Sequence, residues 1–427
     1  MAPVRRLLAA SPFRLVPLLV LLAMVGTACD SGAGPAATQP NPAAALVPAE
    51  EAAVVRAEAA VAVRLPTKPG QAAPALTPGA FAHPLRAHQV VGFLPYWEVN
   101  GFTPAFSELT TVAYWSVSLA AGGAVSHSGQ GYGTLASPAL GLDVLRAHQA
   151  GDRVLLTVFS ENNRVIATVT SHPAAAGRRL AKALAPLLSS GGFDGVDLDI
   201  EGDSTPGRPG FVRFVAAFSK ALRALDPRWS IMLDTYPTSA FDPYGFFDIK
   251  ALAPYVGEMF VMAYEMQQPG IASPTAPLFN SPLNDAMTLA EYTSVVPASR
   301  IILGIPLYGY DFPVAGRGEG ALVTGTPVAV TYQDVVAAGH APTWDPTTET
   351  PLTVFRRGKH WHQTFFDDPV SIALKTALAA QFACAGVGVW DLGMSGGNAS
   401  VSAALLGGSP PLKLPLAGNS SQLEQLR

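Results

Sequence analysis

Short runs of β-branched and aromatic residues alternate with amphipathic helical patterns through the middle of this 427-residue chain. Such alternation is typical of a parallel sheet whose crossovers are helices. The helical spacing of apolar residues is clearest at 174–188, 210–225 and 370–383. Eight strand-like runs can be counted, and eight such units predict an α/β fold, the (β/α)8 TIM barrel. The runs are 90–97, 111–119, 153–159, 195–201, 230–236, 259–265, 300–310 and 386–393.

The interval 311–368, before the last run, is too long for an ordinary loop. It contains strand-like patterns at 328–332 and 352–355 and a helical pattern at 334–338. We therefore expect a small α+β insertion between strands 7 and 8 of a barrel domain that covers 88–408. Because catalytic sites of such barrels lie at the C-terminal ends of the strands, the insertion would wall one side of the site.

The N-terminal 29 residues have the pattern of an export signal. Arg5, Arg6 and Arg14 precede an apolar run at 15–25, which small residues and then Cys29 follow. We predict a lipoprotein-type signal in which Cys29 is lipidated, so that the protein is anchored to the cell membrane outside the cytoplasm. Simple secretion and an uncleaved anchor are the alternatives. The Ala/Pro-rich stretch 30–87 predicts a flexible linker, and 409–427 predicts a mobile tail.

The composition indicates a globular domain that does not bind nucleic acid. Hydrophobic residues make up 49% of the chain and charged residues 14%, so the chain can build one large core. The net charge is −4, and no basic run follows the N-terminus, which argues against nucleic acid as a partner.

The fourth strand-like run carries the candidate chemistry. Asp197, Asp199 and Glu201 alternate there with three aliphatic residues. Since strand side chains alternate between two faces, the three carboxyl groups would share the inside of the barrel. Burial and mutual repulsion raise carboxyl pKa values, which would leave Glu201 protonated as an acid. Binding of a divalent metal ion is the alternative use of such a trio. His360 and His362 are interpreted as ordinary polar positions.

The sequence Asp-Gly-Val-Asp-Leu-Asp-Ile-Glu at 194–201 resembles the signature of glycoside hydrolase family 18, the chitinase family. The resemblance extends over about 88–405. It is supported by Gly-Phe-Leu-Pro-Tyr-Trp at 92–97, Met-Ala-Tyr at 262–264, Leu-Gly-Ile-Pro-Leu-Tyr-Gly at 303–309, Phe-Asp-Asp-Pro at 366–369, and Trp390.

The resemblance implies a retaining, substrate-assisted hydrolysis of β-1,4-linked N-acetylglucosamine glycans, without a cofactor. It assigns Glu201 as acid and base, Asp199 to the acetamido N–H and the oxazolinium ion, Asp197 to tuning of Asp199, and the Tyr264 hydroxyl to the attacking carbonyl. Trp390 would form the floor of the −1 subsite, and Trp115 is a weaker aromatic candidate. The further predicted substrate-binding residues are Tyr96, Trp97, Met262, Glu265 and Asp194.

The chain departs from the family pattern at two positions. Glu265 stands where an aspartate commonly follows the tyrosine, and the third strand ends Val-Phe-Ser at 158–160 where a Ser-Gly-Gly turn is common. We expect a monomeric enzyme that acts on chitin or chitooligosaccharides. The alternatives are a glucosaminidase of peptidoglycan or of the N-glycan core, and a non-catalytic glycan-binding protein on the same barrel.

Overall fold

A computed structural model describes residues 88–203 and 205–407. The predicted export signal with Cys29, the predicted linker and the predicted tail lie outside the described residues. Among the helices that the structure describes, none is both long and apolar enough to cross a bilayer.

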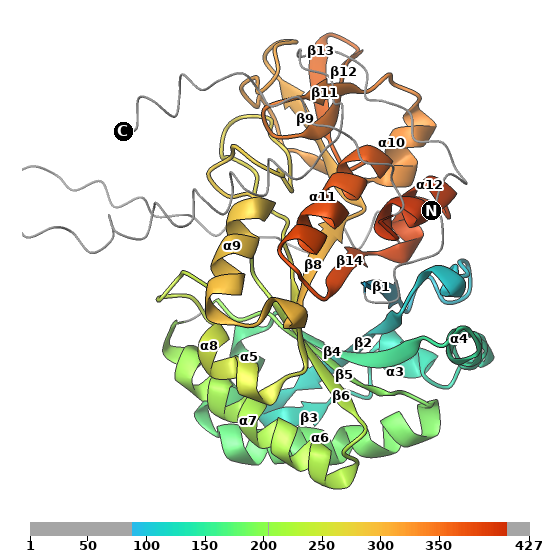
Figure 1. Ribbon diagram of the computed structural model, residues 1–427, viewed down its shortest axis with the longest axis vertical. Coiled ribbons are helices and arrows are strands. Elements are labelled where there is room, and N and C mark those ends of the chain that lie inside the picture. The colour runs from blue at the N-terminus through green and yellow to red at the C-terminus, as the bar shows by residue number, and fades with distance from the viewer. Residues whose placement is uncertain (1–87, 204, 408–427) are drawn as a thin grey trace, which may run out of the picture. The chain divides into compact units, whose positions relative to one another are not determined.

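Eight parallel strands close into a barrel, as the sequence predicts (Figure 1). Closure is shown by the pairing of β1 with both β14 and β2. Around the barrel the strands follow the order β1, β2, β4, β5, β6, β7, β8, β14. Their bounds are β1 Gln89–Pro95, β2 Thr111–Ala120, β4 Arg153–Ser160, β5 Gly195–Ile200, β6 Ser230–Thr235, β7 Glu258–Val261, β8 Ile301–Pro306 and β14 Gly386–Trp390.

Helices cover the outside of the barrel, with α5 to α8 around β4 to β6 in Figure 1. In α6, Leu180, Leu184 and Leu188 recur every four residues and are fully buried, so that one face of the helix packs inward. The helices are α3 Gln130–Thr134, α4 Pro138–Ala150, α5 Asn163–Ser171, α6 Pro173–Gly191, α7 Arg208–Leu225, α8 Ile249–Leu252, α9 Asp285–Val295, α11 Pro369–Gln381 and α12 Ala399–Leu405; a short strand, β3 Ala124–Val125, pairs with β2.

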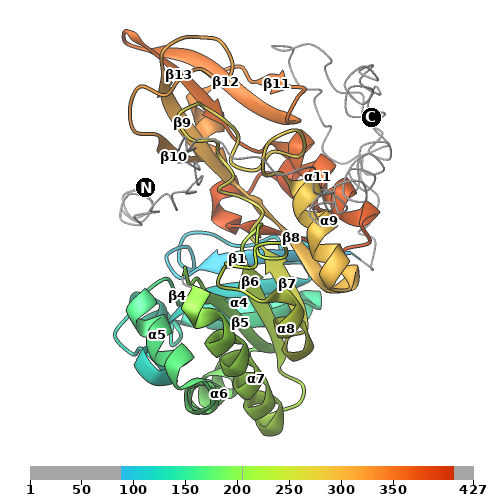
Figure 2. The ribbon, with the colours of Figure 1, turned by 90° about the vertical axis from the view of Figure 1, so that its left-hand side faces the viewer.

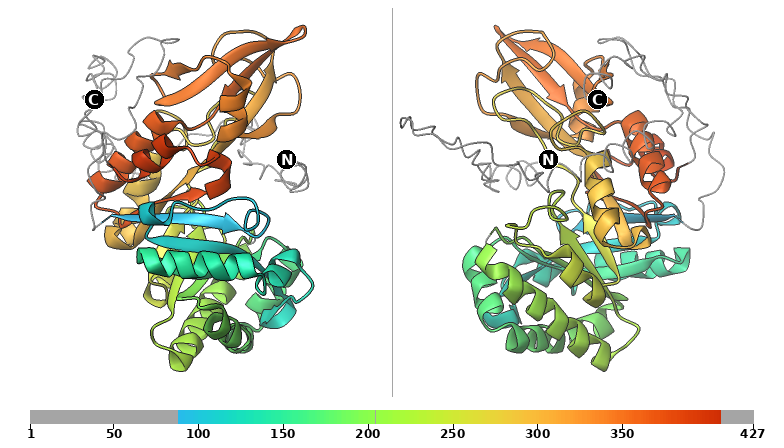
Figure 3. Two further views of the ribbon diagram at one scale, coloured as in Figure 1. Left: turned by 90° about the vertical axis from the view of Figure 1, so that its right-hand side faces the viewer. Right: turned by 60° about the vertical axis from the view of Figure 1, so that its left-hand side comes forward.

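The predicted insertion is present between β8 and β14 as a five-stranded antiparallel sheet with one helix (Figure 2). The sheet stands over one end of the barrel, as the two views in Figure 3 also show. Since β8 leads directly into it, this is the C-terminal end of the barrel strands. The strands follow the order β10-β9-β13-β12-β11. Their bounds are β9 Tyr308–Val314, β10 Val328–Thr331, β11 Thr343–Asp345, β12 Thr350–Arg357 and β13 His360–Phe365, and the helix is α10 Tyr332–Ala338.

The largest errors in the predicted strand limits occur in two of the runs. The run at 300–310 is not one strand, because β8 ends at Pro306 and the chain then joins the insertion sheet as β9, with only Leu307 between them. The run at 259–265 is also too long, since β7 ends at Val261 and Tyr264 and Glu265 lie beyond it. In both cases the apolar pattern continues past the barrel into segments that are buried against the insertion.

Apolar side chains fill the inside of the barrel below the C-terminal ends of the strands. Met232 of β6 belongs to this cluster, and alternation along β6 therefore also turns Asp234 inward. The other buried members are Val91, Phe93, Ala113, Trp115, Leu155, Phe260, Met262, Ile302 and Ala385.

Candidate active site

Strand β5 brings the three predicted carboxyl groups to the inside of the barrel. Asp197 is 0% exposed and Asp199 is 4% exposed, while Glu201 follows the last residue of the strand and is partly exposed. The Glu201 backbone N–H donates to the carbonyl oxygen of Ser160 at 2.8 Å, which fixes this residue beside the end of β4. Glu201 therefore lies closest of the three to the C-terminal end of the barrel.

Neighbouring strands hold the two aspartates in place. The Thr157 hydroxyl of β4 donates to Asp197 Oδ2 at 2.9 Å, and the Trp115 indole N–H of β2 donates to Asp199 Oδ2 at 2.9 Å. A hydrogen bond to a carboxylate favours its ionised form. Trp115 thus has two roles: its ring packs in the barrel core, and its indole N–H donates to Asp199.

The environment raises the pKa values of these groups. Burial raises the pKa of Glu201 well above its ordinary value, and the charges of Asp199, Glu161 and Glu265 raise it further. Burial also raises the pKa of Asp199 to about 7, against the opposing hydrogen bond from Trp115. A carboxyl group that keeps its proton near neutral pH can act as a general acid.

Asp234 and Tyr236, at the end of β6, are part of the site, although the sequence analysis missed them. Asp234 is 2% exposed, and its pKa is raised well above the ordinary value by burial and then by the charges of Asp197 and Asp199. Burial and the charge of Glu201 raise the pKa of Tyr236 in the same way. The signal in the sequence is the alternation of Met232, Asp234 and Tyr236, which has the same period as the alternation along β5.

Glu265 is held by the first strand of the insertion. The Tyr308 hydroxyl donates to Glu265 Oε1 at 2.5 Å, and the Tyr310 hydroxyl lies 3.0 Å from both carboxylate oxygens. The backbone φ of Glu265 is +61°, which is unusual for a residue with a Cβ atom and costs about 1–3 kcal/mol. Burial raises the pKa of Glu265, and that of the adjacent Tyr264 is raised well above its ordinary value.

The predicted aromatic residues form one connected group beside the carboxyl groups. The ring centroid of Trp115 lies 5.1 Å from that of Trp390 and 5.4 Å from that of Trp97, and Tyr96 lies 4.9 Å from Trp97. Trp390 is partly exposed, so part of its indole surface is free for a ligand, whereas Met262 is 8% exposed and packs in the barrel core.

A second pair of carboxyl groups lies next to Trp390. Asp391, which is 0% exposed, forms a side-chain hydrogen bond with Glu98 of the loop after β1. Glu98 Oε2 also accepts the Gly393 N–H at 3.0 Å. Burial raises the pKa of both carboxyl groups, which favours a proton shared within the pair. The pair links the segments that follow β1 and β14, the first and last strands of the barrel.

The structure does not bring Asp194 to this group. It precedes β5 and lies at the opposite end of the strand from Glu201. Its Oδ2 accepts the Val154 N–H at 2.8 Å and is 2.9 Å from His148 Nε2. Its position therefore supports a structural role in joining β4 to β5 and gives no support to the predicted substrate contact.

The two histidines of the insertion lie on β13, apart from the carboxyl groups. His362 Nδ1 is 2.8 Å from Asp311 Oδ1, and His360 is exposed. Within 88–203 and 205–407, no group of three or more His, Cys, Asp or Glu side chains has the arrangement of a metal site.

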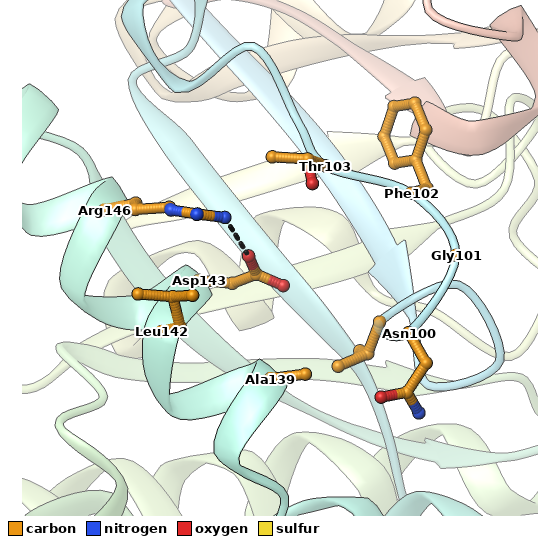
Figure 4. A pocket seen from close by; sticks show the side chains of 9 residues that line it. Asn100, Gly101, Phe102, Thr103, Ala139, Leu142, Asp143 and Arg146 are labelled. Atoms are coloured by element: carbon orange, nitrogen blue, oxygen red, sulfur yellow. Dashed lines mark ion pairs between the residues drawn. The ribbon is translucent and has the colours of Figure 1, made fainter.

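A surface pocket of about 340 Å³ lies between the loop 99–103 and α4 (Figure 4). Asp143 and Arg146 form an ion pair of 3.8 Å along its wall. None of the predicted site residues lines this pocket, so it gives no support to a part in glycan hydrolysis.

Comparison with known families gives a match over most of the barrel. The model of the family described as glycosyl hydrolases family 18 matches residues 89–395. Di-N-acetylchitobiase of Mus musculus is 23% identical over 270 residues, which are 57% of this chain and 71% of that protein. The cortical fragment-lytic enzyme of Bacillus subtilis is 25% identical over 287 residues, 64% of each chain. For several curated relatives the match spans only 56% to 66% of the relative's own length.

Solved structures share the fold at low sequence identity. The family 18 chitinase of Cycas revoluta in complex with (GlcNAc)3 superposes with a TM-score of 0.65 at 20% identity, over 75% of this chain and 98% of that one. A chitinase-like agglutinin of Robinia pseudoacacia superposes with a TM-score of 0.64 at 21% identity, over 74% and 99%.

Proposed function

Because the chain belongs to family 18 of the glycosyl hydrolases, we propose that it hydrolyses β-1,4-linked N-acetylglucosamine glycans with Glu201 as the acid. Membership makes it a glycoside hydrolase, and the (GlcNAc)3 complex of the Cycas revoluta chitinase and the chitobiase relative support the substrate class. The observation that carries the proposal is the place of the Glu201 carboxyl group just after β5 and next to Asp199, where burial raises its pKa well above the ordinary value.

The proposed reaction is substrate-assisted and retaining. The acetamido carbonyl oxygen of the −1 sugar attacks its anomeric carbon while Glu201 protonates the departing glycosidic oxygen. Asp199 accepts the acetamido N–H and stabilises the positive oxazolinium ion, and the Tyr264 hydroxyl donates to the attacking oxygen. Glu201, now ionised, then removes a proton from water, which opens the oxazolinium ring and restores the acid.

The test is cleavage of N-acetylated chitooligosaccharides by the full chain and by Glu201→Gln. The variant keeps the shape of the side chain but has no proton to give, so we expect loss of at least about 10³-fold in kcat with binding retained. Asp194→Asn is the matched control, since it changes an acid that precedes the same strand, at the far end of the barrel, and it should keep near-normal activity. Hydrolysis that survives in Glu201→Gln would refute the assignment of the acid.

A peptidoglycan substrate is the second candidate. The resemblance to the cortical fragment-lytic enzyme of Bacillus subtilis favours it. Release of reducing ends from purified peptidoglycan, with chitooligosaccharides left intact, would select this substrate. Binding of both glycans without cleavage by the intact chain would instead support a glycan-binding protein on this barrel.

We propose further that the chain is exported, is anchored through acylated Cys29 and acts as a monomer. The run of arginines, apolar residues and small residues before Cys29 supports the export and the anchor. Mass spectrometry of the N-terminal peptide would show two or three acyl chains on Cys29. Recovery of an unmodified N-terminus would contradict the anchor.

A further inference from the structure

Two buried carboxylate oxygens next to the reactive residues have no donor. No N–H or O–H group of the described residues donates to Asp197 Oδ1 or to Asp234 Oδ1. The two carboxyl groups come from neighbouring strands and lie close enough for a hydrogen bond between them if one carries a proton. An ionised carboxylate only accepts hydrogen bonds, so this contact requires a proton on one of the two groups. One shared proton satisfies both side chains at once.

The groups around this pair give it no positive charge. Asp199 of β5 and Glu201, which follows this strand, face Asp234, and Tyr264 faces it from the segment after β7. From β4, the Thr157 hydroxyl donates to the other oxygen of Asp197. Among the described residues, no Lys, Arg or His forms an ion pair with these carboxyl groups. Like charges this close cannot all be ionised in a buried site.

The position of the shared proton matters for Asp199. Asp197 has two carboxyl neighbours, Asp234 on β6 and Asp199 on its own strand. The charge of Asp197 raises the pKa of Asp234, and the charge of Asp199 raises the pKa of Asp197. If Asp234 were absent, Asp199 would be the remaining carboxyl group with which Asp197 could share a proton. A protonated Asp199 is neutral and cannot stabilise a cation. An ionised Asp199, which accepts the Trp115 N–H, can do so.

We propose that Asp234 is a positioning residue that shares a proton with Asp197 and thereby leaves Asp199 ionised for the oxazolinium ion. The inference rests on the proposed function, since it assigns Asp234 to the same reaction. Asp234 does not touch the sugar in this scheme and acts through Asp197.

Asp234→Asn and Asp234→Leu separate this role from simple packing. The Asn amide donates to Asp197, and the Asn–carboxylate pair has the same net charge as the wild-type pair with its shared proton. The rate should therefore stay within about threefold of the wild type, and the acid limb of the pH–rate profile should move by no more than a few tenths of a pH unit. The Leu side chain fills similar space without a donor. We expect it to lower kcat on chitotetraose about tenfold or more and to move the acid limb up by about one pH unit.

The pH dependence of the melting temperature tests the proton without any substrate. The wild-type pair holds a proton that the unfolded chain releases at lower pH, so the melting temperature should fall as pH rises from about 5 to about 8. Asp234→Asn removes that proton, and its melting temperature should fall less over the same range.

The inference is overturned if Asp234→Asn is as impaired as Asp234→Leu, if Asp234→Leu keeps the wild-type acid limb, or if the two melting curves share one pH dependence. Should Asp234→Leu fail to fold, the Asn variant and the melting temperatures still decide. A wild-type chain that cleaves no chitooligosaccharide would refute the proposed substrate, and the melting temperatures would still report on the shared proton.

Discussion

Replacement of Trp115 by phenylalanine tests whether an ionised Asp199 is needed in the reaction. The substitution keeps an aromatic ring in the barrel and removes the N–H that donates to Asp199 Oδ2 at 2.9 Å. A hydrogen bond to a charged group contributes about 1.5–3 kcal/mol, which corresponds to about 10- to 150-fold in kcat/KM. The same energy raises the pKa of Asp199 by about one to two units.

The direction of the pH effect follows from the role of Asp199. Its pKa lies at about 7 with the indole in place, and the hydrogen bond lowers it. Without the bond, Asp199 stays protonated to higher pH, so the acid limb of kcat/KM should move upward by about one to two pH units. Initial rates on chitotetraose over a range from acid to mildly alkaline pH measure this shift.

Phe159→Leu is the matched control for packing. The Phe159 ring lies 4.8 Å from that of Trp115, so its loss disturbs the same aromatic contact and leaves the hydrogen bond in place. We expect it to lower the melting temperature without moving the acid limb. A Trp115→Phe enzyme with the wild-type acid limb and kcat/KM within about threefold would show that Asp199 does not act as an anion.

Three further substitutions probe other parts of the molecule. Lys375→Met removes the fully buried ammonium group that lies 2.6 Å from Asp285, and urea unfolding should show a loss of about 3–5 kcal/mol in unfolding free energy; a loss below about 1 kcal/mol would contradict the pairing. Glu98→Gln keeps a hydrogen bond to Asp391 and removes a titrating group whose pKa burial raises. A group whose pKa is raised by folding stabilises the folded protein at low pH, and this contribution is lost as pH rises above about 4. The melting temperature of this variant should therefore fall less between about pH 5 and 8 than that of the wild type. Glu265→Asp shortens the side chain, draws its carboxylate away from two tyrosine hydroxyls and should lower kcat/KM about tenfold. Unchanged kinetics would show that the length of this side chain does not affect the reaction.

The barrel could be predicted because its signals are local. Eight apolar runs and their intervening helical patterns are each readable within short stretches of sequence, and the resemblance to family 18 follows from the contiguous motif at 194–201. Alternation along that motif also predicts that Asp197, Asp199 and Glu201 share one face. The strand limits failed where apolar sequence continues into the insertion, because periodicity does not show which sheet a strand joins.

The missing parts of the site are contacts between distant segments. Asp234 approaches Asp197 only because β6 pairs with β5 in a particular register, in which Asp197 is opposite Met232. Glu98 and Asp391 are far apart in the sequence and meet where the barrel closes. Asp194 shows the reverse error, since it belongs to the sequence motif but lies at the other end of the strand. Membership in a motif does not give the end of the barrel at which a side chain lies.

The direct passage from β8 into β9 through Leu307 has a consequence for how this enzyme could diversify. An inserted lobe is often regarded as an exchangeable module, grafted onto a barrel to alter which polymers are accepted. In this chain the first strand of the lobe supplies the tyrosines that hold Glu265, whose charge in turn raises the pKa of Glu201. Exchange of the lobe would therefore alter the acidity of the catalytic group together with substrate choice. In this lineage, new specificities are expected to arise through changes in β11 and β12, which do not pair with β9, with the β8–β9 junction left intact.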